Sequence, residues 1–309
     1  MPDNVRVITA TATPFTESGD LDLTAARRLF RLIAKTTGAA FVAGTTGEFP
    51  SLDDSERLDL VRVALEELGP DNVIAHIGAA SARRARQLAA RAVAAGATKI
   101  AAVTPYYLPT TPELVTAHYC QVAEAANGAE LYAYLFPERT GLTVTPAELA
   151  ATAKTAGLKG AKLSGTASHH IDEYMDEAPA GFRAYTGRDA DLTRAIRRGA
   201  AGGISAVSSA FPEAYARLVA ALGDTAPGGT AAGDGEVEAA QEAVDRAYAV
   251  GAGVSRIKHA LAVRGVAGPV ARMPTSTVSA EESGAIAELL SQLAPEQAVA
   301  PLCCEWEFT

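Results

Sequence analysis

Short apolar runs alternate with alanine-rich amphipathic segments from the start of the chain to about residue 223. Each run is nearly continuous in apolar residues, which is typical of a strand buried on both faces of a parallel sheet. We count eight pairs of run and segment. The predicted strands cover residues 5–13, 39–44, 73–78, 99–104, 130–136, 158–163, 182–186 and 202–207.

The segments between the runs begin with recognisable helix starts. Aspartate or proline precedes the helices predicted over residues 56–68, 113–126 and 147–156. Eight repeated strand and helix units predict an α/β fold closed into a (β/α)8 TIM barrel. An open doubly wound sheet is the alternative, but it usually carries a glycine-rich phosphate loop after its first strand. Here the first strand leads into Thr13-Pro14-Phe15, without such a loop.

The composition changes after Leu222. Residues 224–235 are rich in glycine and alanine and poor in large apolar side chains, which indicates a flexible linker. Helical patterns resume over residues 236–248, 255–263 and 280–293. We therefore expect a catalytic barrel over residues 1–223, a linker over 224–235, a C-terminal helical extension over 236–295 and a tail over 296–309.

Composition and charge narrow the class of protein. A chain of 309 residues with 48% hydrophobic residues can bury a large core. Its net charge of -9 disfavours nucleic acid and anionic membranes as partners. The chain shows neither a secretory leader pattern nor an apolar run near the ~20 residues of a membrane helix, so we expect a cytoplasmic protein.

Lys162 is the strongest catalytic candidate. It lies in the apolar run 158–163, where burial of an ammonium is costly unless its charge is useful or removed. Burial can lower a lysine pKa far below about 10.4, and the neutral amine attacks carbonyls. The alternative is a lysine at a strand end whose flexible stem reaches solvent.

Other uncommon residues stand where strands lead into loops, which is where catalytic groups of a βα barrel gather. Residues 44–48 read Gly-Thr-Thr-Gly-Glu, a turn whose backbone N–H groups and hydroxyls suit a carboxylate. Tyr134 can relay protons, and Arg139 can bind a carboxylate through two hydrogen bonds. Together with Lys162 these groups predict a carbonyl-condensing site. The remaining strand ends carry Tyr107, Gly187, Arg188 and Ile204.

This ordered set of motifs resembles the dihydrodipicolinate synthase and N-acetylneuraminate lyase family of class I, Schiff-base aldolases. The resemblance implies a (β/α)8 barrel with a C-terminal helical extension. It also implies a lyase in which Lys162 forms an imine with pyruvate or a related 2-oxo acid. The imine then condenses with an aldehyde, or releases one, and the family needs no other cofactor.

The resemblance also implies roles for single residues. Thr45 and Thr46 would bind the pyruvate carboxylate, and Tyr134 would be the general acid and base. Tyr107 matches a tyrosine that completes a proton relay from a neighbouring subunit, which implies a homodimer or a homotetramer of dimers. Arg139 matches the arginine that receives the aldehyde's carboxylate in the synthase branch.

Arg188 departs from the synthase pattern, which usually has an aspartate there. It could join Arg139 in binding an acceptor with a second anionic group, or form a salt bridge to Asp189 or Glu48. Gly187, Arg188 and Ile204 complete the predicted substrate-binding set. A sugar-acid aldolase remains the alternative enzyme, and a non-catalytic 2-oxo-acid sensor is the alternative of another class.

The sequence gives no support for a metal site. His169 and His170 are adjacent, so they point in different directions on a helix. The acidic cluster at residues 53–56 precedes a helix, where carboxylates cap the backbone and complement the helix dipole. We therefore expect no metal.

Overall fold

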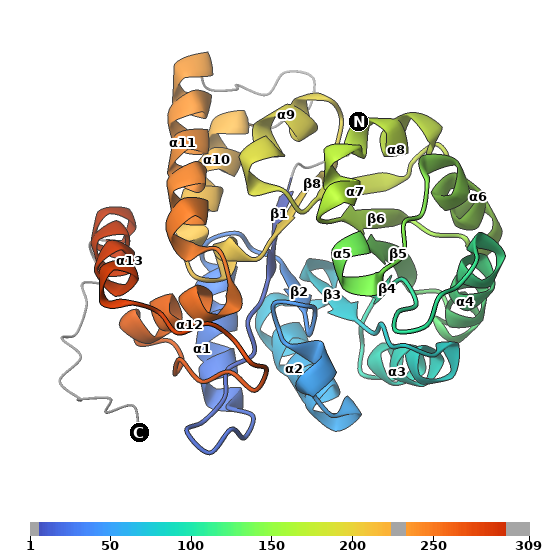
Figure 1. Ribbon diagram of the computed structural model, residues 1–309, viewed down its shortest axis with the longest axis horizontal. Helices are drawn as coiled ribbons and strands as arrows, with labels where there is room; N and C mark the ends of the chain where they lie inside the picture. The colour runs from blue at the N-terminus through green and yellow to red at the C-terminus, as the bar shows by residue number, and fades with distance from the viewer. Residues whose placement is uncertain (1–5, 224–232, 295–309) are drawn as a thin grey trace.

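The computed structural model describes residues 6–223 and 233–294. Eight parallel strands pair in chain order and close into a barrel (Figure 1), which confirms the predicted (β/α)8 fold. Every strand lies within its predicted run, although the predicted runs extend further into the loops. The strands are β1 (Arg6–Ala10), β2 (Ala40–Val42), β3 (Val73–His76), β4 (Lys99–Val103), β5 (Glu130–Leu135), β6 (Gly160–Leu163), β7 (Arg183–Thr186) and β8 (Gly202–Ser205).

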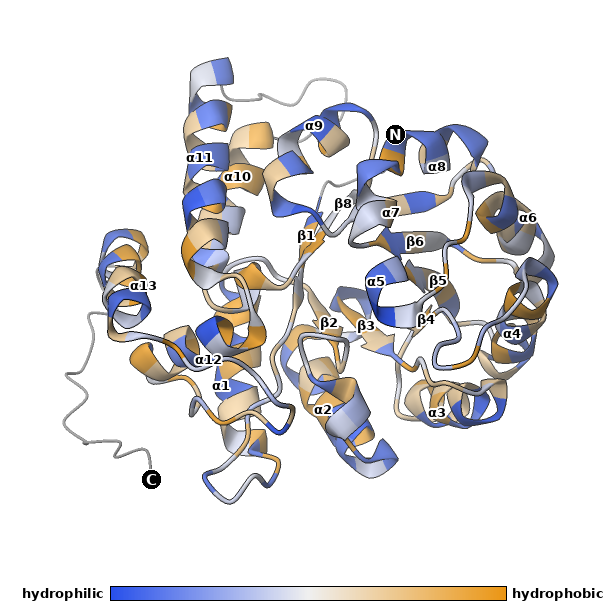
Figure 2. Ribbon diagram, in the orientation of Figure 1, coloured by the Kyte–Doolittle hydropathy of each residue, from blue (hydrophilic) through white to orange (hydrophobic). Residues whose placement is uncertain are grey.

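Helices surround the barrel, and each carries apolar and polar residues side by side (Figure 2), as amphipathic helices do. The backbone N–H of Asp53 donates to Glu56 at 2.9 Å at one helix start, so these two acidic residues do cap a helix. The ring comprises α1 (Leu23–Ala34), α2 (Asp54–Leu68), α3 (Ala82–Ala94), α4 (Pro112–Ala125), α6 (Pro146–Ala156), α8 (Ile171–Glu177), α9 (Leu192–Arg197) and α10 (Pro212–Leu222). Short helices occupy the loops, namely α5 (Pro137–Thr140), α7 (Thr166–His169), η1 (Phe49–Ser51), η2 (Pro70–Asn72), η3 (Asp189–Asp191) and η4 (Val207–Ser209).

The strands separate two apolar layers because their side chains alternate between the lumen and the helices. Phe41, Tyr134 and Ile204 belong to the inner cluster, which fills the barrel. Leu163 belongs to the outer cluster beneath the helices, although it directly follows Lys162. The alternation therefore directs Lys162 into the lumen.

The C-terminal extension consists of α11 (Asp234–Gly251), α12 (Val254–Val263) and α13 (Ala280–Leu293). In Figure 1, α11 runs beside α10, so the extension packs on the barrel. The helix α11 begins at Asp234, so the last two residues of the predicted linker are helical. Asp234 is favoured in the first turn of the helix, and its carboxylate lies 2.7 Å from Arg197. Residues 224–232 and the predicted tail over 296–309 lie outside the described residues.

Within the described ranges, no helix combines the length and the apolar character that crossing a membrane requires.

Candidate active site at the carboxyl ends of the strands

Lys162 is enclosed by aromatic rings in the barrel lumen. Only 6% of the residue is exposed, so the alternative of a solvent-reaching lysine is wrong. Its Nζ lies 4.5 Å from the centre of the Tyr134 ring and 4.7 Å from that of Phe41. Burial lowers the pKa of Lys162 to about 7, although the charge of Asp189 opposes the shift. A substantial share of the amine is therefore neutral and nucleophilic near neutral pH.

Tyr134 connects Lys162 to the turn after β2. The two residues pair across the ladder of β5 and β6, and the Tyr134 hydroxyl lies 3.1 Å from Thr45 Oγ1. Burial raises the pKa of Tyr134 to about 12, against the opposing effect of hydrogen bonds with Thr45 and Ser164. The phenol is therefore protonated at neutral pH and can exchange a proton with a bound oxygen atom. The structure thus brings together three of the predicted catalytic residues.

The turn over residues 44–48 presents free backbone donors. The N–H of Glu48 donates to the Thr45 carbonyl at 3.0 Å, and Thr13 Oγ1 donates to the Gly47 carbonyl at 2.7 Å. Within the described part of the chain, the backbone N–H groups of Thr45 and Thr46 have no hydrogen-bond partner. Free N–H groups in a tight turn are suited to an anion such as a carboxylate.

Gly187 allows β7 to pass close to the residues that follow Lys162. A Cβ atom at this position would lie 2.4 Å from Ser164 Oγ and 2.9 Å from the Leu163 carbonyl oxygen. Any side chain would therefore push against the backbone of β6. The glycine predicted here is required by this close approach rather than by its backbone angles.

Asp189 is a site residue that the sequence analysis considered only as a partner for Arg188. It is 3% exposed, and its Oδ2 accepts hydrogen bonds from Ser205 (2.9 Å) and Tyr215 (2.8 Å). Burial raises the pKa of Asp189 to about 6, while these hydrogen bonds and the charge of Lys162 oppose the shift. Asp189 is therefore a buried carboxylate held between β8 and α10, on the helix side of the sheet, and its charge acts on the Lys162 amine.

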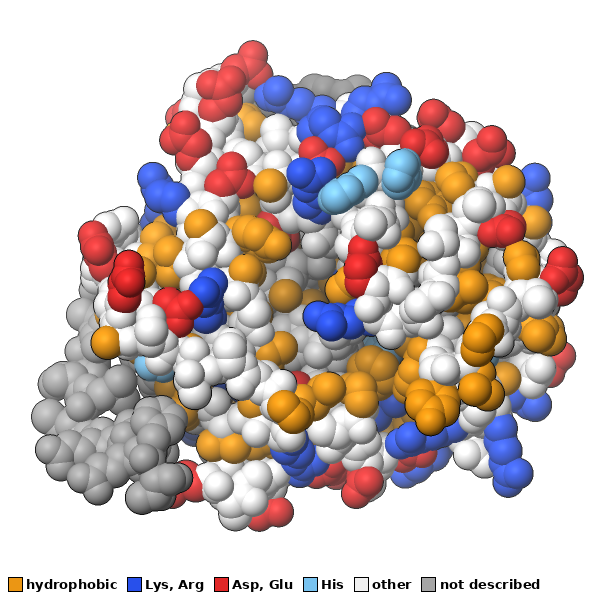
Figure 3. Space-filling model, in the orientation of Figure 1, with side chains coloured by type: hydrophobic (Ala, Val, Ile, Leu, Met, Phe, Trp, Pro, Cys, Tyr) orange, Lys and Arg blue, Asp and Glu red, His pale blue; other side chains and the backbone are white. Residues whose placement is uncertain are grey.

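Arg139 and Arg188 are both exposed. The Arg139 guanidinium lies over the Phe136 ring, 5.5 Å from its centre. The proposed salt bridge from Arg188 to Asp189 or Glu48 is wrong, because Asp189 is bound by hydroxyls and Glu48 by Lys258. In Figure 3, which views the molecule from the side of the βα loops, the barrel mouth is hollowed, and both basic and acidic side chains stand at its rim.

The three remaining predicted site residues differ in their exposure to solvent. Ile204 is 3% exposed in the inner core, and Thr46 is 8% exposed beside Thr45. Tyr107 lies in the loop between β4 and α4 and is 89% exposed, with φ of 84°. A tyrosine in the left-handed region is uncommon. Within one chain Tyr107 therefore stays at the surface, and it does not join the Lys162 cluster.

His76 is a lumen residue whose place the sequence did not reveal. It is 1% exposed, and its ring centre lies 5.9 Å from that of Tyr134. Its Nδ1 lies 2.9 Å from the Ala43 carbonyl oxygen and its Nε2 lies 3.3 Å from the Val103 N–H nitrogen, which fits a neutral ring protonated at Nδ1. Burial also lowers the pKa of His76 well below its usual range. His76 thus fills the lumen as an uncharged group.

In the ranges that the structure describes, no three His, Cys, Asp or Glu side chains are grouped so that they could hold a metal ion.

The comparisons with known proteins agree with this geometry. The chain matches the model of the dihydrodipicolinate synthetase family over residues 3–293. A 4-hydroxy-tetrahydrodipicolinate synthase of Moorella thermoacetica is 32% identical over 297 residues, which cover 93% of this chain and 97% of that protein. The dihydrodipicolinate synthase of Aquifex aeolicus shares the fold with a TM-score of 0.84 at 24% identity, over 96% of this chain and 99% of that chain. A structure described as the first monomeric dihydrodipicolinate synthase variant has a TM-score of 0.81 at 28% identity, over 94% of this chain and 98% of that one. With a family match over nearly its whole length and the lysine, tyrosine and threonine of the predicted site gathered at one end of the barrel, this chain belongs to the dihydrodipicolinate synthetase family.

Proposed function

We propose that this protein is a pyruvate-dependent class I lyase most like 4-hydroxy-tetrahydrodipicolinate synthase. It condenses the Lys162 imine of pyruvate with an aldehyde, for which aspartate semialdehyde is the acceptor we favour. The observation that carries the proposal is the buried Lys162 amine, with its pKa lowered to about 7, beside the hydrogen-bonded pair of Tyr134 and Thr45. No separate cofactor is needed, because the protonated imine itself withdraws electrons.

In the first step the neutral amine of Lys162 attacks the keto carbon of pyruvate. The free N–H groups of Thr45 and Thr46 hold the pyruvate carboxylate during this step. The amine gives one of its protons to the former keto oxygen, the Tyr134 hydroxyl gives a second, and the oxygen leaves as water, which produces the protonated imine. Thr45 then returns a proton to Tyr134 across their 3.1 Å hydrogen bond and regains one from the water at the site.

In the second step the methyl carbon next to the imine loses a proton to a base at the site, and an enamine forms. The enamine carbon attacks the carbonyl carbon of the aldehyde, a carbon–carbon bond forms, and the aldehyde oxygen accepts a proton. The positive charge on the imine nitrogen is favoured by the buried Asp189 and by the faces of the surrounding rings. Hydrolysis or cyclisation of the product then frees Lys162.

The exposed Arg139 and Arg188 support an acceptor that carries one or two anionic groups. Arg139 favours the carboxylate of a semialdehyde, because a guanidinium binds a carboxylate through two parallel hydrogen bonds. Among the described residues the exposed Arg188 guanidinium forms no ion pair within 4 Å, although its charge lowers the pKa of Asp191, so it can bind a second anionic group. A sugar-acid aldolase is the second candidate, and this uncommitted arginine is the observation that favours it.

We further propose that the protein acts as a homodimer, or as a homotetramer of dimers, in the cytoplasm. Tyr107 is 89% exposed next to Leu108, which is 71% exposed, and Leu114 nearby is 58% exposed. Such adjacent exposed apolar side chains suit a subunit contact. In that contact Tyr107 would enter the partner's site and extend the relay from Thr45 through Tyr134.

Trapping with borohydride tests the proposal. Pyruvate and borohydride should give a stable adduct on the wild-type protein, and Lys162→Ala should abolish it. Turnover with aspartate semialdehyde and with sugar-derived aldehydes then distinguishes the two enzymes. An adduct without any turnover would indicate the non-catalytic 2-oxo-acid sensor, and the absence of an adduct would rule out the imine mechanism.

A further inference from the structure

Glu48, the last residue of the turn over residues 44–48, is held by the C-terminal extension. It is 1% exposed, and its Oε1 lies 2.5 Å from the Nζ of Lys258 on α12. Its Oε2 accepts hydrogen bonds from the backbone N–H groups of Arg272 (2.9 Å) and Met273 (2.7 Å). Both carboxylate oxygens of Glu48 therefore bind groups from the segment that follows the barrel.

Lys258 is itself buried, and its ammonium contacts a carbonyl oxygen and an aromatic ring in addition to Glu48. It is 1% exposed, its Nζ donates to the Val270 carbonyl at 2.5 Å, and it lies 4.2 Å from the centre of the Phe15 ring. Burial lowers the pKa of Lys258, and Glu48 opposes this shift. An ammonium so deeply buried depends on its carboxylate partner, and the same is true of the carboxylate.

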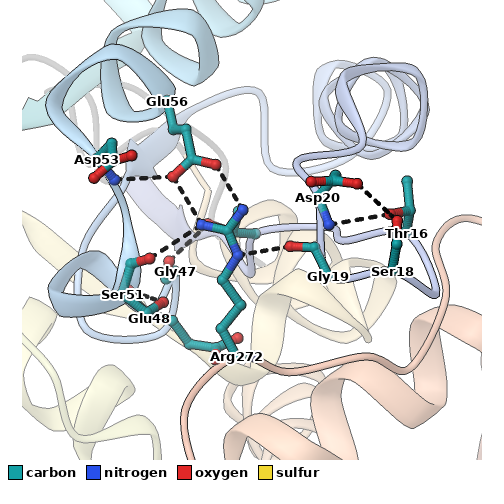
Figure 4. A network of polar contacts seen from close by, with 11 residues as sticks. Thr16, Ser18, Gly19, Asp20, Gly47, Glu48, Ser51, Asp53, Glu56 and Arg272 are labelled. Atoms are coloured by element: carbon teal, nitrogen blue, oxygen red, sulfur yellow. Dashed lines mark hydrogen bonds and ion pairs between the residues drawn. The ribbon is translucent and has the colours of Figure 1, made fainter.

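Arg272 joins the extension to three further segments around the turn (Figure 4). Its guanidinium donates to both carboxylate oxygens of Glu56 on α2, at 2.6 and 2.7 Å. It also donates to the carbonyl of Ser51 in η1 at 3.0 Å and to the carbonyl of Gly19 at 2.7 Å. The Arg272 side chain therefore binds Ser51 and Glu56, which follow the turn, whereas the backbone of the extension binds Glu48.

The conformation of the turn needs such support. Glu48 has φ of 55°, a left-handed conformation that a residue other than glycine adopts only when its surroundings impose it. The N–H of the same residue donates to the Thr45 carbonyl at 3.0 Å. A displacement of the Glu48 side chain would therefore shift the peptide groups of Thr45 and Thr46.

We propose that Lys258 and Arg272 are positioning residues for the pyruvate site. Lys258 acts through Glu48, and the Arg272 guanidinium acts through Glu56 and Ser51, on the turn that holds the pyruvate carboxylate. The inference rests on the proposed function, which assigns that carboxylate to Thr45 and Thr46. The C-terminal extension then holds the turn over residues 44–48 in the conformation that binds pyruvate. Neither Lys258 nor Arg272 needs to touch the substrate.

The test measures pyruvate affinity separately from the chemistry of Lys162. Lys258→Met removes the charge and keeps most of the side-chain volume, and Arg272→Ala removes the guanidinium bonds. Each should raise the pyruvate concentration that gives half-maximal borohydride trapping, by about 10- to 100-fold, because hydrogen bonds to a charged group are strong. The trapping rate at saturating pyruvate should change little.

A matched control separates positioning from stability. Arg264 and Glu213 form another buried ion pair, at 2.5 Å, between the end of α12 and α10. Arg264→Met should destabilise the fold without changing the half-saturating pyruvate concentration. The double variant Glu48→Gln/Lys258→Met should recover most of the lost affinity, because the glutamine oxygen can still accept from the N–H groups of Arg272 and Met273.

Each outcome has one meaning. If wild type traps no pyruvate, the proposed function fails, whatever the variants do. If wild type traps pyruvate and both Lys258→Met and Arg272→Ala keep its half-saturation, the positioning role is overturned. If Lys258→Met does not fold, Arg272→Ala decides alone, because its side chain is 22% exposed and better tolerates replacement.

Discussion

Lys162 and Tyr134 are direct neighbours across the ladder of β5 and β6, and the Lys162 Nζ lies 4.5 Å from the centre of the Tyr134 ring. The ring covers the amine from solvent, and burial lowers the pKa of Lys162 to about 7. The same tyrosine carries the hydroxyl that meets Thr45. One side chain therefore sets both the nucleophilicity of the lysine and the position of the proton relay.

The first prediction concerns the pH dependence of imine formation. Because the neutral amine attacks and the pKa of Lys162 is about 7, the initial rate of pyruvate trapping should rise from pH 6 to pH 8 and then level off. A solvated lysine, with a pKa near 10.4, would give a rate that still rises tenfold per unit above pH 8. Rapid-mixing trapping with borohydride across this range measures the profile. A continued rise to pH 10 would contradict the lowered pKa.

Asp189→Asn tests the buried carboxylate. The folded-state pKa of Asp189 is raised from 3.8 to about 6, so its contribution to stability is complete below pH 4 and is lost as the pH rises through 6. The free energy of unfolding of wild type, relative to the variant, should therefore fall by about 2–3 kcal/mol between pH 4 and pH 8. Urea unfolding of both proteins at several pH values provides the comparison.

The same variant should move the trapping profile of Lys162 to lower pH, because the negative charge of Asp189 raises the lysine pKa. If both the stability difference and the profile stay constant, Asp189 is not coupled to the site.

Tyr134→Phe should lower kcat by about 10²- to 10⁴-fold, the range expected for loss of a general acid and base. Pyruvate affinity should change little, since the hydroxyl contacts Thr45 rather than the turn's backbone N–H groups. Steady-state kinetics with pyruvate and the accepted aldehyde measures both parameters. Thr45→Ser, which keeps a hydroxyl, serves as the control, and an equal loss of kcat in both variants would argue against a relay through that hydroxyl.

The fold could be predicted because each strand and each helix is encoded by a short, continuous stretch of the sequence. A barrel strand is a short apolar run, and a closed parallel barrel needs nothing more than eight runs separated by amphipathic helices. The predicted boundaries failed where the chain leaves the sheet. Residues 11–13, for example, were assigned to the first strand, but β1 ends at Ala10. Small and apolar residues continue beyond the last residue of β1, so composition does not show where the strand ends.

The site could be predicted where a polar residue interrupts an apolar run, as Lys162 and Tyr134 do. Asp189 and Lys258 lack this signal. Each stands among polar or mixed neighbours, and its burial depends on partners from distant segments, such as Tyr215 for Asp189 and Glu48 for Lys258. Sequence spacing cannot reveal a buried ion pair between a loop after the second strand and a helix beyond the barrel.

Gly187→Ala tests the close approach between β6 and β7. The new methyl group would meet the Leu163 carbonyl oxygen and Ser164 Oγ, so the variant should lose about 1–3 kcal/mol of unfolding free energy and most of its pyruvate trapping. Gly284→Ala in α13 is the opposite case. No atom lies within 4 Å of its Cβ position, and alanine should stabilise that helix by about 0.5–1 kcal/mol. Thermal or urea unfolding compares the two, and equal effects would argue against the predicted clash.

The last prediction concerns Tyr107, whose side chain is 89% exposed in one chain. If it acts in the site of a partner subunit, Lys162→Ala and Tyr107→Phe should complement each other. A mixed dimer would contain one site with an intact Lys162 and a Tyr107 supplied by the lysine variant. Unfolding and refolding the two inactive proteins together should therefore yield activity that neither shows alone, with the mixed species identified by native mass spectrometry. Activity equal to the sum of the parents, in a sample that contains mixed dimers, would place Tyr107 outside the relay.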